Sequence, residues 1–232
     1  MIRKEGGFTG ASHIHAVRYR DQLGNSPSFS VAQAAAQDDS NAGLTKGVQF
    51  IVTRVKEYQI YTLEQEAILA GRDDKGSLLR TLTTEVDSAL NHAGRRVAVA
   101  LYGAGMGEMA GPITVASLVI TVGEAVTNFE QGMTIVGAAS VTGALRNSGT
   151  GCLVTLVDRS AGTITIDANT DSLATGDYLF QKGDRGTGSS PTALKIAGLE
   201  AWNPVTAPAL SSSFFGVDRG PDPDRLAGLR LD

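Results

Sequence analysis

The chain has 232 residues and a formal net charge of −4, with 42% apolar and 19% charged side chains. This apolar share excludes a chain that is disordered throughout, and the absence of a basic stripe excludes a protein that holds nucleic acid tightly. The single cysteine, Cys152, excludes a disulfide framework and a cysteine-based metal site. The most apolar region, 97–122, is interrupted by glycines, a glutamate and a proline, so no membrane span is expected.

The N-terminal part is expected to contain an arm and then a strand. Residues 1–46 are polar and small, with apolar residues at no regular period, so we expect an arm with little structure of its own or a disordered tail. Residues 48–62 are rich in β-branched and aromatic types. Val48, Phe50 and Val52 recur at the period of two that is typical of a strand.

A long helix is predicted over 74–102, where apolar residues recur three or four positions apart. These residues are Leu78, Leu79, Leu82, Val86, Ala89, Leu90, Ala93, Val97 and Leu101. Asp73 and Asp74 suit the positive N-terminal end of the helix, and Arg95 and Arg96 suit its last third. Neither the helix nor the strand before it can bury its apolar face against its sequence neighbours. We therefore expect other copies of the chain to cover both.

Residues 113–182 contain five short strand-like runs separated by turn residues. The runs are ITVASLVITV, MTIVGAAS, CLVTLV, GTITID and DYLFQKG. The turn at 160–162 is expected to join two of them as a hairpin, and five short strands at this spacing predict a small barrel or a sandwich. A short helix at 195–202, a loop over 203–224 and a new apolar element over 225–231 follow.

No constellation of residues predicts catalysis or a bound metal. His13 and His15 would share one face of a strand, but no carboxylate lies close in sequence, so a surface or interface role is the better interpretation. The stretch 167–172 begins like a calcium loop. It has Ser172 where glycine is needed and Tyr178 where a glutamate is needed, so we interpret it as a turn. We expect a protein that is not an enzyme and needs no cofactor.

Six segments, in a fixed order, carry a resemblance to a known family. They are VTRVKEYQIYTLEQEAI (52–68), DDKGSLLRTLTTEVDSALNHAGRRVAVALYG (73–103), VTNFEQGMTIV (126–136), GDYLFQKGD (176–184), IAGLEAWNP (196–204) and SSFFGVDRGPDPDRLAGLRLD (212–232). Together they resemble the major capsid protein of tailed bacteriophages, which has the Hong Kong 97-like fold. The resemblance covers most of the chain from about residue 48 on, and it rests on the order of the segments.

The resemblance implies an α+β fold with five parts. They are an N-terminal arm (1–46), an extended loop (47–72), a spine helix with its connector (73–112), a β-rich barrel or sheet that is peripheral or inserted (113–184), and a connector helix, a loop and the start of an axial domain (185–232). Family members continue into an axial domain that packs around the five- and six-fold centres. The resemblance therefore predicts either that the natural chain continues past Asp232 or that the axial contacts are built differently.

The implied function is that of a structural subunit of an icosahedral or prolate capsid shell that encloses double-stranded DNA without sequence-specific binding. The implied partners are other copies of the chain in pentamers and hexamers, and can include decoration, scaffold or portal proteins, but no membrane. Such a shell is assembled in the host bacterial cytoplasm and is located in the virion. The candidate assembly-interface residues are Arg54, Lys56, Glu57, Tyr58, Glu64, Arg72, Asp73, Arg95, Arg96, Phe214, Phe215 and Arg219.

Two other functions remain open from the sequence. The first is a different virion module, such as a decoration, tail-tube or baseplate protein, in which the β section is the working part. The second is a hydrolase among the glycine-rich loops, which would gather His92 or His13 with carboxylates in one pocket.

Overall fold

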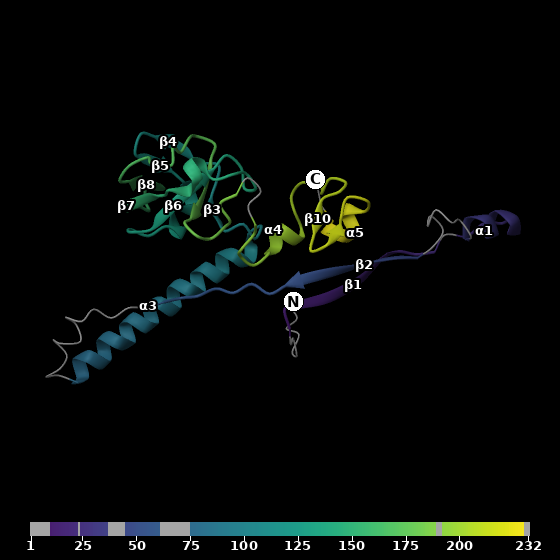
Figure 1. The fold of residues 1–232 in the computed structure, drawn as a ribbon, viewed down its shortest axis with the longest axis horizontal. Coiled ribbons are helices and arrows are strands. Elements are labelled where there is room, and N and C mark those ends of the chain that lie inside the picture. The colour runs from purple at the N-terminus through teal and green to yellow at the C-terminus, as the bar shows by residue number, and fades with distance from the viewer. Residues whose placement is uncertain (1–9, 23, 37–44, 61–74, 189–191, 230–232) are drawn as a thin grey trace. The chain divides into compact units, whose positions relative to one another are not determined.

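Figure 1 shows the computed structural model of the chain. The structure describes residues 10–22, 24–36, 45–60, 75–188 and 192–229, with the side chains of the long helix from Leu82 on. Helices and strands are mixed, as expected for an α+β protein. The chain divides into two units, one formed by residues 1–54 and 203–232 and the other by residues 55–202.

The first unit is built on an antiparallel ribbon of two strands, β1 (Ser12–Arg20) and β2 (Lys46–Thr53). The period of two in β2 is confirmed, because Phe50 is buried between the half-buried Val48 and Val52, while the residues between them are exposed. The ribbon register pairs His15 with Phe50. Each face of the ribbon therefore carries side chains from both strands.

The prediction that residues 1–46 have little structure of their own was wrong, since they contain β1 and the helix α1 (Phe29–Ala36). The strand β1 (SHIHAVRYR) carries polar side chains on both of its faces, which hides the apolar alternation that marks a strand. Its partner β2 follows only after α1, so no local sequence window contains the pair. Pairing with a distant strand decided this part of the structure.

The C-terminal part of the first unit contains a small hairpin of β10 (Ser213–Phe214) and β11 (Val217–Asp218), followed by the helix α5 (Pro223–Ala227). The expected loop over 203–224 thus contains regular structure, and the expected apolar element at its end overlaps α5. The Ile51 backbone N–H donates to the Phe215 carbonyl at 2.9 Å. The C-terminal segment is therefore tied to the edge of β2.

The second unit contains α3 (Lys75–Tyr102), a helix of 28 residues that is about 40 Å long at 1.5 Å per residue. This confirms the predicted helix over 74–102, and the helix is continuous through Gly94. From Leu82 to Tyr102, every described side chain is exposed or half-buried and none is buried. The helix therefore has little of its surface covered by its own chain.

A sheet of seven strands forms the rest of the second unit. The strands are β3 (Glu108–Ala110), β4 (Thr114–Ala116), β5 (Val119–Thr121), β6 (Thr134–Ala138), β7 (Cys152–Asp158), β8 (Thr163–Ile166) and β9 (Tyr178–Gln181). Their order is β3-β9-β6-β7-β8-β5-β4, and neighbours are antiparallel. The two end strands, β3 and β4, follow each other in the chain. The buried apolar side chains form two clusters, and the larger one receives residues from β3, β5, β6, β7, β8 and β9. We refer to this sheet as the barrel, after the small barrel or sandwich that the sequence predicts.

The five predicted runs all contain strands, with one difference. The run at 113–122 is a hairpin of β4 and β5 rather than one strand, because the chain turns at Ser117, whose φ is +60°. The predicted hairpin across 160–162 is confirmed by the pairing of β7 with β8. Three short helices connect the strands: η1 (Gly123–Asn128), η2 (Arg146–Gly149) and α4 (Leu199–Trp202), the last being shorter than the predicted 195–202.

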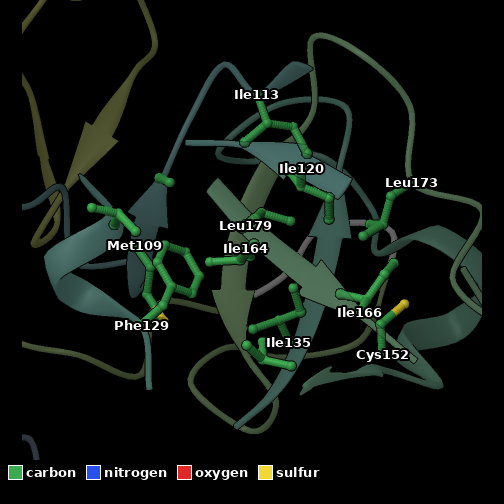
Figure 2. Close-up of a cluster of buried hydrophobic side chains, with 13 residues drawn as sticks. Met109, Ile113, Ile120, Phe129, Ile135, Cys152, Ile164, Ile166, Leu173 and Leu179 are labelled. Atoms are coloured by element: carbon green, nitrogen blue, oxygen red, sulfur yellow. The ribbon is translucent and has the colours of Figure 1, made fainter. Parts of the chain in front are cut away.

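The barrel core is a cluster of small and medium apolar side chains around one aromatic ring. Figure 2 shows Met109, Ile113, Ile120, Phe129, Ile135, Cys152, Ile164, Ile166, Leu173 and Leu179 pointing toward one another from the surrounding strands and loops. Phe129 is fully buried, and so is the cysteine. Because these strands bury their apolar positions against one another, the barrel completes its own core.

Candidate assembly surface

The structure places the twelve predicted interface residues in several different surroundings. Glu64, Arg72 and Asp73 lie outside the described residues. Those that are described fall into an ion cluster beside α3, an aromatic cluster in the β10–β11 hairpin, and a set of exposed side chains.

The ion cluster joins α3 to the barrel. The Arg96 guanidinium pairs with the Asp184 carboxylate, and Lys195 Nζ lies 3.1 Å from Asp184 Oδ1 and also pairs with Glu57. The Arg96, Asp184 and Lys195 side chains are only 10 to 12% exposed. Two cations and two anions thus neutralise each other in a partly desolvated site, where such pairs contribute more than they do on the surface.

This cluster gives Arg96 and Glu57 partners inside the chain. The four side chains come from separate segments: the stretch after β2, α3, the turn after β9 and the stretch before α4. Their chemistry fits the attachment of the helix to its own barrel. Their use in a contact between subunits stays a prediction.

Arg95 lies on a more open part of α3. Its guanidinium donates to Glu130 Oε1 at 2.7 Å, and Arg159 lies 3.9 Å from the same oxygen. The Arg95 side chain is 59% exposed, so this pair contributes little to stability. Arg95 therefore keeps most of its surface open to a neighbour.

The aromatic cluster consists of Phe214, Phe215 and Arg219. The two rings are 4.6 Å apart between centroids, and the Arg219 guanidinium lies 4.0 Å from the Phe214 centroid. Arg219 is only 6% exposed, and Phe215 has a φ of +48°. A phenylalanine in this left-handed conformation is strained, and the strain is held by its ring contact and by the Ile51 hydrogen bond. These three residues thus pack against one another within the first unit.

The other predicted residues are exposed in the structure. Arg54, Lys56 and Tyr58 follow β2 without regular secondary structure, and the Tyr58 ring is 78% exposed. The Arg54 backbone N–H still donates to the Ala11 carbonyl at 3.1 Å, so the ribbon extends one step beyond β2. This is the segment that the resemblance assigns to an overlap with the adjacent subunit.

Two exposed apolar surfaces contain residues that the sequence analysis did not include among the candidate interface residues. One lies on α3, where Leu90, Val97 and Leu101 are 64, 37 and 43% exposed. The other lies on the ribbon, where Ile14 and Ile51 are direct cross-strand partners and are 58 and 46% exposed. The helical period was recognised in the sequence, but it could not say which apolar residues the chain's own barrel leaves open.

The hydrolase hypothesis predicts a pocket that gathers His92 or His13 with carboxylates. His92 and Glu130 do line one small pocket, but the Glu130 carboxylate is bonded to Arg95, and the pocket has no serine or cysteine. His92 Nδ1 instead lies 3.4 Å from Gln59 Oε1. Thr127 also lines this pocket, and its hydroxyl donates to the Glu124 carbonyl at 3.3 Å.

Metal-ligand groupings are equally lacking in the described parts of the chain, which contain no group of three histidine, cysteine, aspartate or glutamate side chains fit to hold an ion. His13 and His15 share one face of β1, as predicted, and both are exposed. The stretch 167–172 is a turn, also as predicted. Its Asp171 is fully buried and accepts the Gly151 N–H at 2.7 Å, and burial raises the pKa of this carboxyl.

One carboxyl group has a strongly shifted acidity. Glu108 is half-buried at the start of β3, and burial together with the charge of Glu200 raises its pKa to about 7. This group is ionised at high pH and neutral at low pH within the physiological range. Glu108 belongs to the second unit, and among the described residues it is part of no grouping of side chains that could hold a metal ion.

The helices of the described chain include none that is both long enough and apolar enough to cross a bilayer. Comparisons with protein families, with curated proteins and with solved structures find no match for this chain.

Proposed function

We propose that this chain is a structural subunit of a tailed-bacteriophage capsid, a shell with the Hong Kong 97-like fold that encloses double-stranded DNA. The observation that carries the proposal is the exposure of α3: from Leu82 to Tyr102 it has no buried side chain among those described, and three of its large apolar residues are open. Most surface helices of globular proteins bury an apolar stripe against their own core. Here the uncovered stripe supports a contact with another copy.

The ribbon supports the same proposal. A ribbon of two strands is marginally stable alone in water, and the exposed Ile14–Ile51 pair lies on one of its faces. Where the edge of a strand is not covered by the chain itself, its backbone groups can also bind another chain. An extended ribbon of this kind suits an arm or loop that lies across a neighbouring subunit.

The barrel supports the proposal in a different way. It completes its own core and leaves the helix and the ribbon as the incomplete parts. A subunit needs such a stable body, because repeated weak contacts give a stable shell only if each subunit stays folded. The ion cluster of Arg96, Asp184, Lys195 and Glu57 attaches the helix to that body.

The charge of the chain is compatible with enclosed DNA. The formal net charge is −4, and a weakly acidic wall lets packed DNA move without being held at many phosphates. The resemblance of the six ordered segments supplies the specific family, with pentamers and hexamers as the assembled units.

The test is to purify the full chain and examine it by electron microscopy and by sedimentation over a range of concentrations. We expect curved shells, or pentameric and hexameric rings. A chain that stays monomeric at every concentration would contradict the proposal. Trimers, or rings with other than five or six subunits, that never form curved assemblies would instead favour a decoration, tail-tube or baseplate protein.

A further inference from the structure

One side of α3 carries a seam with the repeat of a helix-pairing surface. We define the outer seam as Leu90, Gly94, Val97 and Leu101, whose spacings of four, three and four average the 3.5–3.7 residues of a helix-pairing stripe. All four are exposed. A Cβ added at Gly94 would meet no atom within 4 Å. The seam is therefore open along its whole length, with a flat position near its middle.

Apart from Asp87, the residues that flank the seam are uncharged. Asn91, Ala93 and Ala98 flank it and carry no charge. The nearby cations Arg95 and Arg96 point elsewhere, because they pair with the carboxylates of Glu130 and Asp184 on the barrel side. An uncharged apolar surface can meet an identical surface without electrostatic repulsion, as a twofold contact requires.

The position of one acidic residue decides the orientation of the partner. Asp87 precedes Leu90 by three residues and is exposed on nearly the same side of α3. Two parallel helices would place their Asp87 carboxylates opposite each other, whereas two antiparallel helices keep them at opposite ends of the contact. The helix dipoles also favour the antiparallel pair.

We propose that the α3 helices of two copies of this chain pack antiparallel through the outer seam and cross at Gly94. The contact rests on the proposed self-assembly and names one interface within it. Leu90 to Leu101 spans about 16 Å of helix, so one such contact is small and weak. Weak contacts suit a shell, because reversible association allows misplaced subunits to leave.

The test places like charges in the seam of the full chain and measures self-association by sedimentation equilibrium. Gly94→Glu should weaken the association at least about tenfold, because two glutamates then meet across the twofold axis. Leu90→Glu should also weaken it, because a charged side chain then has to be buried in the apolar contact. Ser88→Glu is the matched control: it adds the same charge to an exposed position of the same helix, about 160° around the axis from Leu90. Its association should equal that of the native chain.

A folding defect cannot imitate this result at Gly94. Glutamate forms helix more readily than glycine, and the position has open space around it. Gly94→Glu should therefore raise the melting temperature of the monomer while it weakens association. A lowered melting temperature together with unchanged association would overturn the proposal.

Disulfide trapping tests the orientation. Gly94→Cys should form a covalent dimer on mild oxidation, because the two positions meet at the crossing, and Leu101→Cys should not, because antiparallel copies hold these residues far apart. The native Cys152 is buried, so we expect it not to form a disulfide in this experiment. Trapping at Leu101 but not at Gly94 would refute the antiparallel crossing.

The outcomes separate this contact from the proposed function. If the native chain self-associates and the seam variants associate equally well, the seam contact is wrong while shell assembly stands. If the native chain does not self-associate at all, the proposed function fails and this contact fails with it.

Discussion

The raised pKa of Glu108 predicts that the second unit loses stability as the pH rises. Glu108 lies half-buried at the start of β3, paired with Phe180 of β9, and burial and the charge of Glu200 raise its pKa from 4.5 to about 7. The folded chain thus holds a proton that the unfolded chain releases. The free energy of unfolding should fall between about pH 4.5 and about pH 7 and then remain level.

The size of this effect follows from the shift. One pKa unit corresponds to about 1.36 kcal/mol, so a rise from 4.5 to about 7 has an upper bound of about 3.4 kcal/mol. Because water reaches part of the Glu108 side chain, we expect about 1 to 2 kcal/mol. The variant Glu108→Gln imitates the neutral form. It should match the native chain near pH 4.5 and exceed its stability by about 1 to 2 kcal/mol near pH 8.

The assay is urea denaturation followed by tryptophan fluorescence at several pH values. The chain has one tryptophan, Trp202 in α4, which belongs to the same unit as Glu108. Glu124→Gln, at an exposed position of η1, is the matched control and should leave the pH profile unchanged. Glu200→Gln should remove the smaller, electrostatic part of the effect. If the native profile rises with pH, or if Glu108→Gln keeps the native slope, the reasoning is refuted.

Three further substitutions test the packing of the barrel. Asp177 is 2% exposed and accepts two hydrogen bonds from Arg146 at 2.9 and 2.6 Å; Asp177→Ala should cost about 3 kcal/mol in the free energy of unfolding, because it leaves backbone and guanidinium donors unpaired. Phe129→Ala should cost about 3 to 5 kcal/mol in the same urea experiment, since the ring is fully buried in the core. Gly162→Ala should cost at least about 1 kcal/mol, because φ is +67° and the added Cβ would lie 3.1 Å from Gly123.

Each of these substitutions has a comparison that isolates its cause. For the ion pair, the double variant Asp177→Ala with Arg146→Ala should lose less stability than the sum of the two single variants. For the turn, Gly188→Ala is the control, because it has an ordinary φ and no atom within 4 Å of the added Cβ. Equal losses at Gly162 and Gly188 would contradict the argument from backbone conformation.

Strong local patterns predicted several elements correctly from the sequence. The helix over 74–102 follows from a long run of apolar residues three to four apart, and the structure begins and ends it within one residue of that range. The strand-like runs over 113–182 follow from β-branched residues between turns. In both cases the pattern that predicts the element lies within a few neighbouring residues, so it can be recognised in a short stretch of sequence.

Elements that depend on distant partners were not predictable in this way. The strand β1 exists because β2 pairs with it from beyond α1. The run at 113–122 divides into two strands because the chain turns at Ser117, and β5 then pairs with both β4 and the distant β8. The ion cluster contains side chains from four segments, and no spacing of residues in the sequence predicts it. Such features arise when separate pieces of chain meet.

The sequence by itself determined the apolar stripe of α3, because helical periodicity is a property of neighbouring residues. Only the tertiary structure decided which side of that helix meets the barrel and which side remains open. Arg96 turns toward Asp184, and Leu90 and Leu101 are thereby left exposed. The physical reason is that burial depends on what packs against a surface, and the packing partner lies far away along the chain.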